Sequence, residues 1–198
     1  MLSGEDIQKN IQAAWRLMFG GNDALHQLDL SADGFWDSFM GIALALPPMA
    51  LSWVMLTADP AIPLGNFSVG HILAALAVID LAAWMVPLIV FALAAPRLGL
   101  ASRIVPYVVA TNWSGAILSW MMAPASLARL FFPDASDFGS LLGLSLFFLA
   151  QFLSWRVTTY AIDRGPAVGT AVFAAMFVLS LAVIFPLQAL LGISAVGG

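Results

Sequence analysis

Five long apolar stretches constrain the fold of this chain more than any other feature, because each has 20 or more residues. An α-helix rises 1.5 Å per residue, so about 20 residues cross a hydrocarbon core about 30 Å thick. We therefore predict an all-α polytopic transmembrane bundle of five helices over residues 34–198, preceded by an N-terminal segment over residues 1–33. The expected spans are residues 34–57, 69–95, 104–123, 139–161 and 167–191. The breaks between them contain turn residues, notably Asp59-Pro60 with Pro63, Pro96 with Gly99, Pro133-Asp134 and Asp163 to Pro166.

Composition supports lipid as the solvent of this chain. Of the 198 residues, 62% are hydrophobic and only 9% are charged, against about 25% charged in soluble domains. The net charge of −4 argues against nucleic-acid binding, since neutralisation of phosphates needs clustered cations. The chain has no cysteine, which excludes disulfides, thiolate metal sites and cysteine catalysis.

The N-terminal segment contains a pattern typical of an amphipathic helix over residues 4–19. Ile7, Ile11 and Trp15 fall on one side of such a helix, and Lys9 and Arg16 fall on the other. This helix could lie flat on the membrane surface, or it could pack against the protein's own cytoplasmic loops. Residues 22–33 are polar and acidic and are expected to form a linker.

The distribution of cations predicts the orientation, because cytoplasmic loops are enriched in Lys and Arg. With five spans, six of the seven cations fall on the side of the N-terminus, and only Arg129 falls on the other. The six are Lys9, Arg16, Arg97, Arg103, Arg156 and Arg164, and the last four would line the inner membrane interface. The Ala-rich, Lys-poor composition suggests a bacterium. We expect a bacterial inner-membrane protein with a cytoplasmic N-terminus and a periplasmic C-terminus.

Asp80 is the acidic residue deepest within a predicted span, and a charge at that depth is costly. Helical rise places Asp80, Asn112 and Gln151 at a similar depth near the midplane, on three different spans. Such a polar layer could bind a proton, an ion or a small solute. Alternatively, Asp80 is protonated or hydrogen-bonded and joins helices together, with Asn112 and Gln151 as the leading partners.

Pro47 and Pro48 are expected to bend or break the first span near mid-membrane. In a transporter such a break would be a hinge or part of a binding site. In a static bundle it would be a kink that fits the packing of neighbouring helices.

The arrangement resembles the Yip1-like membrane proteins, which have a polar cytoplasmic N-terminus and five closely spaced spans. The most suggestive residues run from Gln151 to Arg156 (sequence QFLSWR), followed by Tyr160 and the short turn from Asp163 to Pro166. The resemblance covers about residues 35–192 and implies a non-enzymatic role in membrane organisation, trafficking or complex assembly. It assigns no functional residue, and the polar segment before residue 34 has no counterpart in it.

Catalytic chemistry has little support in this sequence. No nucleophile, base and acid fall together, so no catalytic residue, cofactor or metal site is predicted. The two histidines, His26 and His71, are predicted on opposite sides of the membrane, which excludes a paired-histidine metal site within one chain. The leading hypothesis is a non-catalytic scaffold, accessory or assembly subunit whose partners are the bilayer and other membrane proteins. The alternative is a small permease or channel subunit, which would require a water-accessible cavity at Asp80.

Overall fold

The computed structural model describes residues 2–58, 67–131 and 136–193, and in these ranges every regular element is a helix. The expected turns at Asp59-Pro60, Pro63 and Pro133-Asp134 lie outside the described residues. The N-terminal part contains α1 (Gly4–Phe19), the 3-10 helix η1 (Asn22–Gln27) and the short α2 (Ala32–Asp37). The long helices are α3 (Met40–Ala58), α4 (Val69–Ala94), α5 (Ile104–Phe131), α6 (Ser136–Ile162) and α7 (Pro166–Leu190), with η2 (Ala101–Arg103) before α5.

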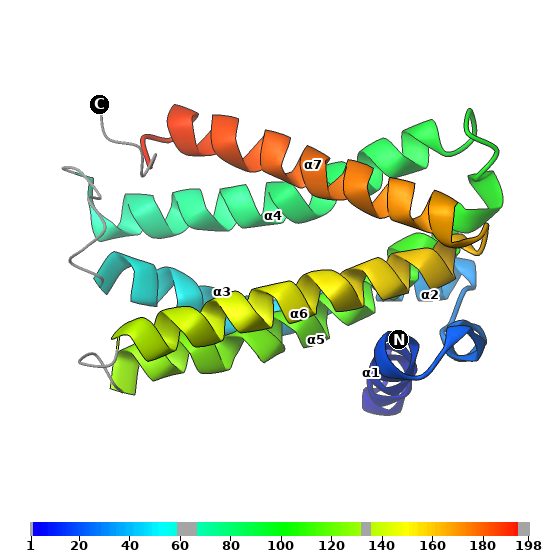
Figure 1. The fold of residues 1–198 in the computed structure, drawn as a ribbon, viewed down its shortest axis with the longest axis horizontal. Coiled ribbons are helices and arrows are strands. Elements are labelled where there is room, and N and C mark those ends of the chain that lie inside the picture. Colours follow the sequence, from blue (N-terminus) through cyan, green and yellow to red (C-terminus); the bar gives the residue numbers. More distant parts are fainter. Residues whose placement is uncertain (1, 59–66, 132–135, 194–198) are drawn as a thin grey trace.

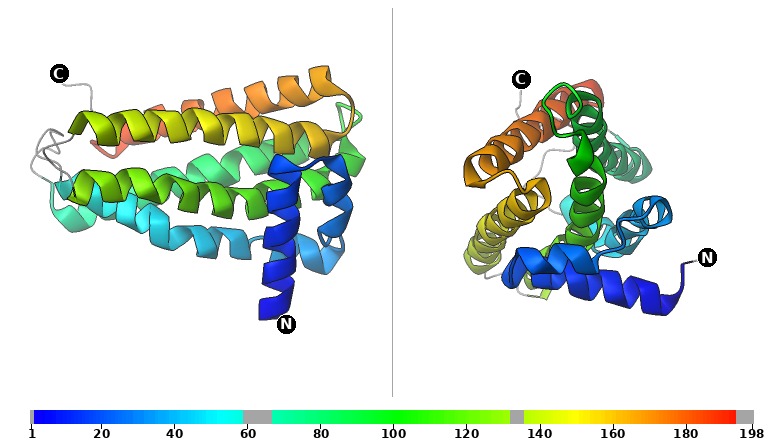
Figure 2. Two further views of the ribbon diagram at one scale, coloured as in Figure 1. Left: turned by 60° about the horizontal axis from the view of Figure 1, so that its bottom comes forward. Right: turned by 90° about the vertical axis from the view of Figure 1, so that its right-hand side faces the viewer.

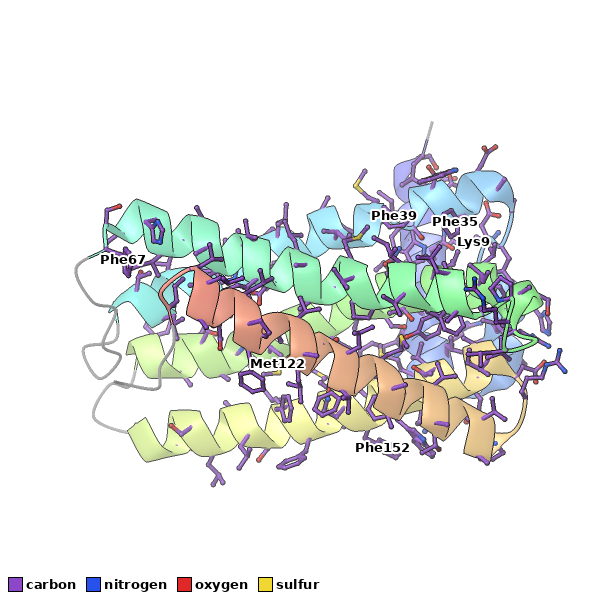
Figure 3. All side chains as sticks on the ribbon, turned by 90° about the horizontal axis from the view of Figure 1, so that it is seen from above. Lys9, Phe35, Phe39, Phe67, Met122 and Phe152 are labelled. Atoms are coloured by element: carbon purple, nitrogen blue, oxygen red, sulfur yellow. The ribbon has the colours of Figure 1, made fainter. Side chains whose placement is uncertain are left out.

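The five long helices run between the same two ends of the molecule and form two layers (Figure 1). One layer contains α4 and α7, and the other contains α3, α5 and α6. α4 contacts α7 far more extensively than it contacts α5. The two layers therefore make few contacts with each other between α4 and α5. Figure 2 shows α1 lying across one end of the bundle, where it packs against α5 and α6. Phe35 and Phe39 lie at this end with Lys9, and Phe67 lies at the opposite end (Figure 3).

Within the residues that the structure describes, four helices are long and apolar enough to cross a membrane: Ala32–Ala58, Val69–Ala94, Phe138–Ile162 and Pro166–Leu190. The 26 residues of α4 alone reach about 39 Å, which exceeds a hydrocarbon core of about 30 Å. Their outer faces expose large apolar side chains that a soluble monomer would bury, including Phe148 on α6 and Phe185 on α7. These features indicate a membrane protein.

α5 is not among these four helices, and its surroundings explain why. It is packed by α3 and α6 along its length and by α1 at one end, so much of its surface faces protein. Val109, Asn112 and Trp113 on α5 are all fully buried. A helix enclosed by other helices can hold polar side chains where they find partners, and its average hydropathy falls as a result.

The first expected span, residues 34–57, differs from the sequence-based expectation in the position of its interruption. We expected a bend or break at Pro47-Pro48, and α3 continues as helix through both prolines, so the helix is not broken there. The interruption lies instead at Ser38 and Phe39, between α2 and α3. The physical reason is that groups on α5 supply hydrogen bonds at both places, as described below.

Candidate functional site

Asp80 on α4 accepts a hydrogen bond from Trp53 on α3, with 2.6 Å between Nε1 and Oδ2. The carboxyl group is half-buried between these helices. In the described part of the chain, no hydrogen bond joins Asp80 to Asn112 or Gln151, so the expected partners of Asp80 are replaced by an indole. Asp80 therefore faces a neighbouring helix, and its contact ties α3 to α4.

Asn112 is the centre of a second polar contact that joins three parts of the bundle. Its side chain is fully buried. Its Oδ1 accepts a hydrogen bond of 3.1 Å from Trp84 Nε1 on α4, and its Nδ2 donates one of 3.0 Å to Ser38 Oγ. Ser38 stands at the interruption between α2 and α3 and donates in turn to the Phe35 carbonyl at 2.7 Å. Asn112 thus fastens the start of α3 and the middle of α4 to α5.

Two prolines inside helices leave backbone carbonyls without their usual donors, and a neighbouring helix supplies each missing donor. Pro48 has no N–H for the Leu44 carbonyl, which instead accepts a bond of 2.9 Å from Trp120 Nε1 on α5. Pro87 likewise frees the Ala83 carbonyl, which lies 3.3 Å from the donating Ser180 hydroxyl on α7. That hydroxyl is shared with the Met176 carbonyl at 3.1 Å. The Trp120 contact thus gives one of the carbonyls freed at Pro47-Pro48 a partner on α5, as expected where a neighbouring helix stabilises a proline inside a span.

A cavity of about 320 Å³ lies between α4 and α7 on one side and α5 and α6 on the other. Gln151, on α6, lines it, whereas Asp80 does not. Eight of the lining side chains have hydroxyl or amide groups: Tyr107, Thr111, Ser114, Ser119, Gln151, Ser154, Thr158 and Ser180. The polar layer expected around Asp80 is thus divided into three separate places: the Asp80–Trp53 pair, the Asn112 contact and this cavity.

α1 presents two different surfaces. Ala13, Ala14, Leu17 and Met18 are buried against the bundle, and Ile7 and Ile11 are half-buried against the same core. Trp15 is 52% exposed and packs on Phe19 with 4.5 Å between ring centroids. Lys9 and Arg16 are exposed and line a polar groove beside η1, where Arg16 Nη1 donates to Gln27 Oε1 at 3.1 Å.

The four interface cations predicted from the sequence lie near the turns at the α1 end of the bundle. Arg103 forms an ion pair of 2.8 Å with Asp163, which brings the α4–α5 connection against the α6–α7 turn. Arg156 donates a hydrogen bond of 3.2 Å to the Tyr160 hydroxyl and lies 5.6 Å from the centre of its ring. Arg97 and Arg164 are exposed.

Sequence reasoning missed most of the partners in these contacts. Trp53, Trp84 and Trp120 each donate an indole N–H to a neighbouring helix, and none of these three contacts was predicted from the sequence. The prolines contained a usable signal, because a proline within a helix always frees the carbonyl four residues earlier. The direction in which each indole points required the packing of the helices.

Comparison with known protein families, with curated proteins and with solved structures finds no match for this chain. Among the residues that the structure describes, no group of three or more His, Asp or Glu side chains is placed to hold a metal ion.

Proposed function

We propose that this chain is a non-catalytic, five-span subunit of the bacterial inner membrane, acting as a scaffold or assembly partner for other membrane proteins. The observation that supports this role best is the use of polar groups inside the bundle. Asp80, Asn112, Trp120 and Ser180 all make contacts between helices, so the side chains that a permease would use for transport serve here to hold the bundle together.

In this proposal α5 is the fifth span, although its hydropathy is lower than that of the other four. Its 28 residues correspond to about 42 Å, and it runs beside α6 between the same two ends of the bundle (Figures 1 and 2). The Arg103–Asp163 ion pair supports the same arrangement, since it places two connections at one end. With the cation-rich end in the cytoplasm, the N-terminus is cytoplasmic and the C-terminus periplasmic.

α1 is proposed to lie in the plane of the inner interface. It crosses the end of the bundle instead of continuing a span (Figure 2). Its exposed Trp15 suits the headgroup region, where amphipathic rings are favoured, and its exposed Lys9 and Arg16 suit anionic headgroups or water. A helix held this way forms a cytoplasmic platform beside the membrane, which suits a role in membrane organisation.

Partner proteins are proposed to bind the outward face of α6, which has several exposed aromatic side chains. Phe147, Phe148 and Phe152 are 42%, 62% and 50% exposed, and Phe152 lies on the outside of the helix (Figure 3). In lipid, association of helices depends on close packing and not on burial from water, so this aromatic surface selects a protein neighbour whose shape matches it.

The test is native electrophoresis of the tagged chain, gently extracted from its own membranes, with identification of the co-migrating proteins. The proposal predicts a discrete complex larger than the chain, which Phe148→Ala weakens and the matched change Phe185→Ala on α7 leaves intact. A chain that migrates alone, together with a solute or proton flux in vesicles that Asp80→Asn abolishes, would overturn this role and favour the permease.

A further inference from the structure

The cavity between the two helix layers has the dimensions of a ligand site. Its volume of about 320 Å³ falls in the range of small-molecule pockets, about 300–1,000 Å³, and exceeds the space of a single water many times. Its walls come from α4, α5, α6 and α7, in the half of the bundle that ends at the α6–α7 turn. The loose contact between α4 and α5 explains why a space exists there.

On the α5 wall, two buried hydroxyl groups have no hydrogen-bond partner in the described part of the chain. Ser114 is 2% exposed, and its Oγ is buried without a partner among the described residues. The Thr111 hydroxyl, one turn earlier on the same helix, is in the same state. Both residues line the cavity. Buried polar groups in proteins are nearly always satisfied, so these two hydroxyls are candidates to bind a polar group in the cavity.

The opposite walls add a further donor and acceptor and an apolar surface. Gln151 and Ser154 contribute an amide and a hydroxyl from α6. Trp84, Phe173 and Phe177 contribute aromatic rings from α4 and α7. No Asp, Glu, Lys, Arg or His side chain is among the described residues that line the cavity. A charged ligand would have no counter-ion there, so the chemistry selects an uncharged molecule.

We propose that this cavity binds an uncharged amphiphile drawn from the bilayer, with a hydroxyl or carbonyl head and an apolar body. The head hydrogen-bonds to the Thr111 and Ser114 hydroxyls and to Gln151, and the apolar body packs against the rings of α4 and α7. α6 and α7, which form two of its walls, diverge from their shared turn (Figure 1). This ligand site does not depend on the proposed scaffold role.

The probe for the test is a photoreactive dodecanol bearing a diazirine, applied to the full-length chain in lipid nanodiscs, with mass-spectrometric mapping of the adducts. We expect saturable labelling of peptides that contain Trp84 or Phe173. Unlabelled dodecanol should displace it at least tenfold more effectively than dodecane, because the alkane lacks the head group. Diffuse or unsaturable labelling, or equal displacement by dodecane, would overturn the proposal.

Matched variants make the test specific. Ser154→Phe fills the cavity and should abolish saturable labelling, whereas Ser145→Phe, on the exposed face of α6, should leave it unchanged. Thr111→Val keeps the shape of the side chain and removes its hydroxyl, so dodecanol affinity should fall about tenfold while the thermal unfolding temperature is retained. If Ser154→Phe does not fold, the Thr111→Val measurement decides: an unchanged affinity contradicts the proposed site.

Discussion

The contact between Trp120 and the carbonyl freed by Pro48 yields a prediction with a defined magnitude. Removal of the donor by Trp120→Phe leaves the Leu44 carbonyl unsatisfied beside lipid, where no water replaces it. Hydrogen bonds between membrane helices average about 0.6 kcal/mol and reach about 1.7 kcal/mol. The open carbonyl adds to this loss, so Trp120→Phe should lower the free energy of unfolding by about 1–2 kcal/mol.

A double-mutant cycle isolates the hydrogen bond from the packing of the ring. Pro48→Ala restores an N–H four residues after Leu44, so the carbonyl regains its helical partner and no longer needs the indole. In that background Trp120→Phe should cost about 1 kcal/mol less, because only the packing change remains. The free energies come from SDS titration in mixed micelles, followed by far-UV circular dichroism. The matched control is Pro186→Ala, another proline inside a helix, which should be additive with Trp120→Phe.

The same logic applies at the second proline, which gives an internal replicate. Ser180→Ala and Pro87→Ala should also be coupled, by a smaller amount, because the Ser180 bond is longer and shared with Met176. If the changes in unfolding free energy were additive in both cycles, side chains from adjacent helices would not be the donors that satisfy the carbonyls freed by Pro48 and Pro87.

Three further changes test other contacts of the bundle. Asp80→Asn should preserve folding and function, since an amide still accepts the hydrogen bond from Trp53. Asp80→Leu removes the acceptor and should lower the free energy of unfolding by about 1–2 kcal/mol in the same SDS titration. Equal stability of the two variants would contradict the pairing of Asp80 with Trp53. Gly41→Ala should lower the stability of the fold by about 1–3 kcal/mol, because the added Cβ meets the α5 backbone. The control Gly70→Ala, whose Cβ meets nothing within 4 Å, should be neutral or slightly stabilising. A neutral Gly41→Ala would show that α3 does not approach α5 so closely. Hydrogen bonds from Ser3 hold the pKa of the Asp6 carboxyl below its usual 3.8, so the start of α1 is stabilised above that pH and loses this contribution as the pH falls through 3.8 and below. Amide exchange of α1, corrected for intrinsic rates, should report this loss in the native chain and not in Asp6→Asn; an identical pH profile in both would count against the cap.

The parts of the fold that follow from apolar run length could be predicted from the sequence. The helix over residues 4–19 matches α1, and four of the five expected spans coincide closely with helices that are long and apolar enough to cross a membrane. Their existence depends on the hydrophobic effect and helical rise alone, which act on local sequence. The break at Ser38 was missed because it depends on a distant partner, Asn112.

The polar contacts were only partly predictable, and the reason is geometric. Depth along a helix follows from residue number, so Asp80, Asn112 and Gln151 could be placed at similar heights. The direction in which each side chain points depends on how the helices rotate against one another, which a single sequence does not fix. The structure turns Asp80 toward α3 and Gln151 toward the cavity.

The five-span arrangement, with the N-terminus inside, is tested most directly by the sides on which the two ends of the chain lie. The chain has no natural cysteine, so Ser3→Cys and Ala195→Cys each introduce a unique thiol. In intact cells, a membrane-impermeant maleimide should label the cysteine at position 195 from the periplasm. The cysteine at position 3 should react only after the membrane is opened. Labelling of both positions from the same side would mean an even number of spans, and would contradict α5 as a membrane-crossing helix.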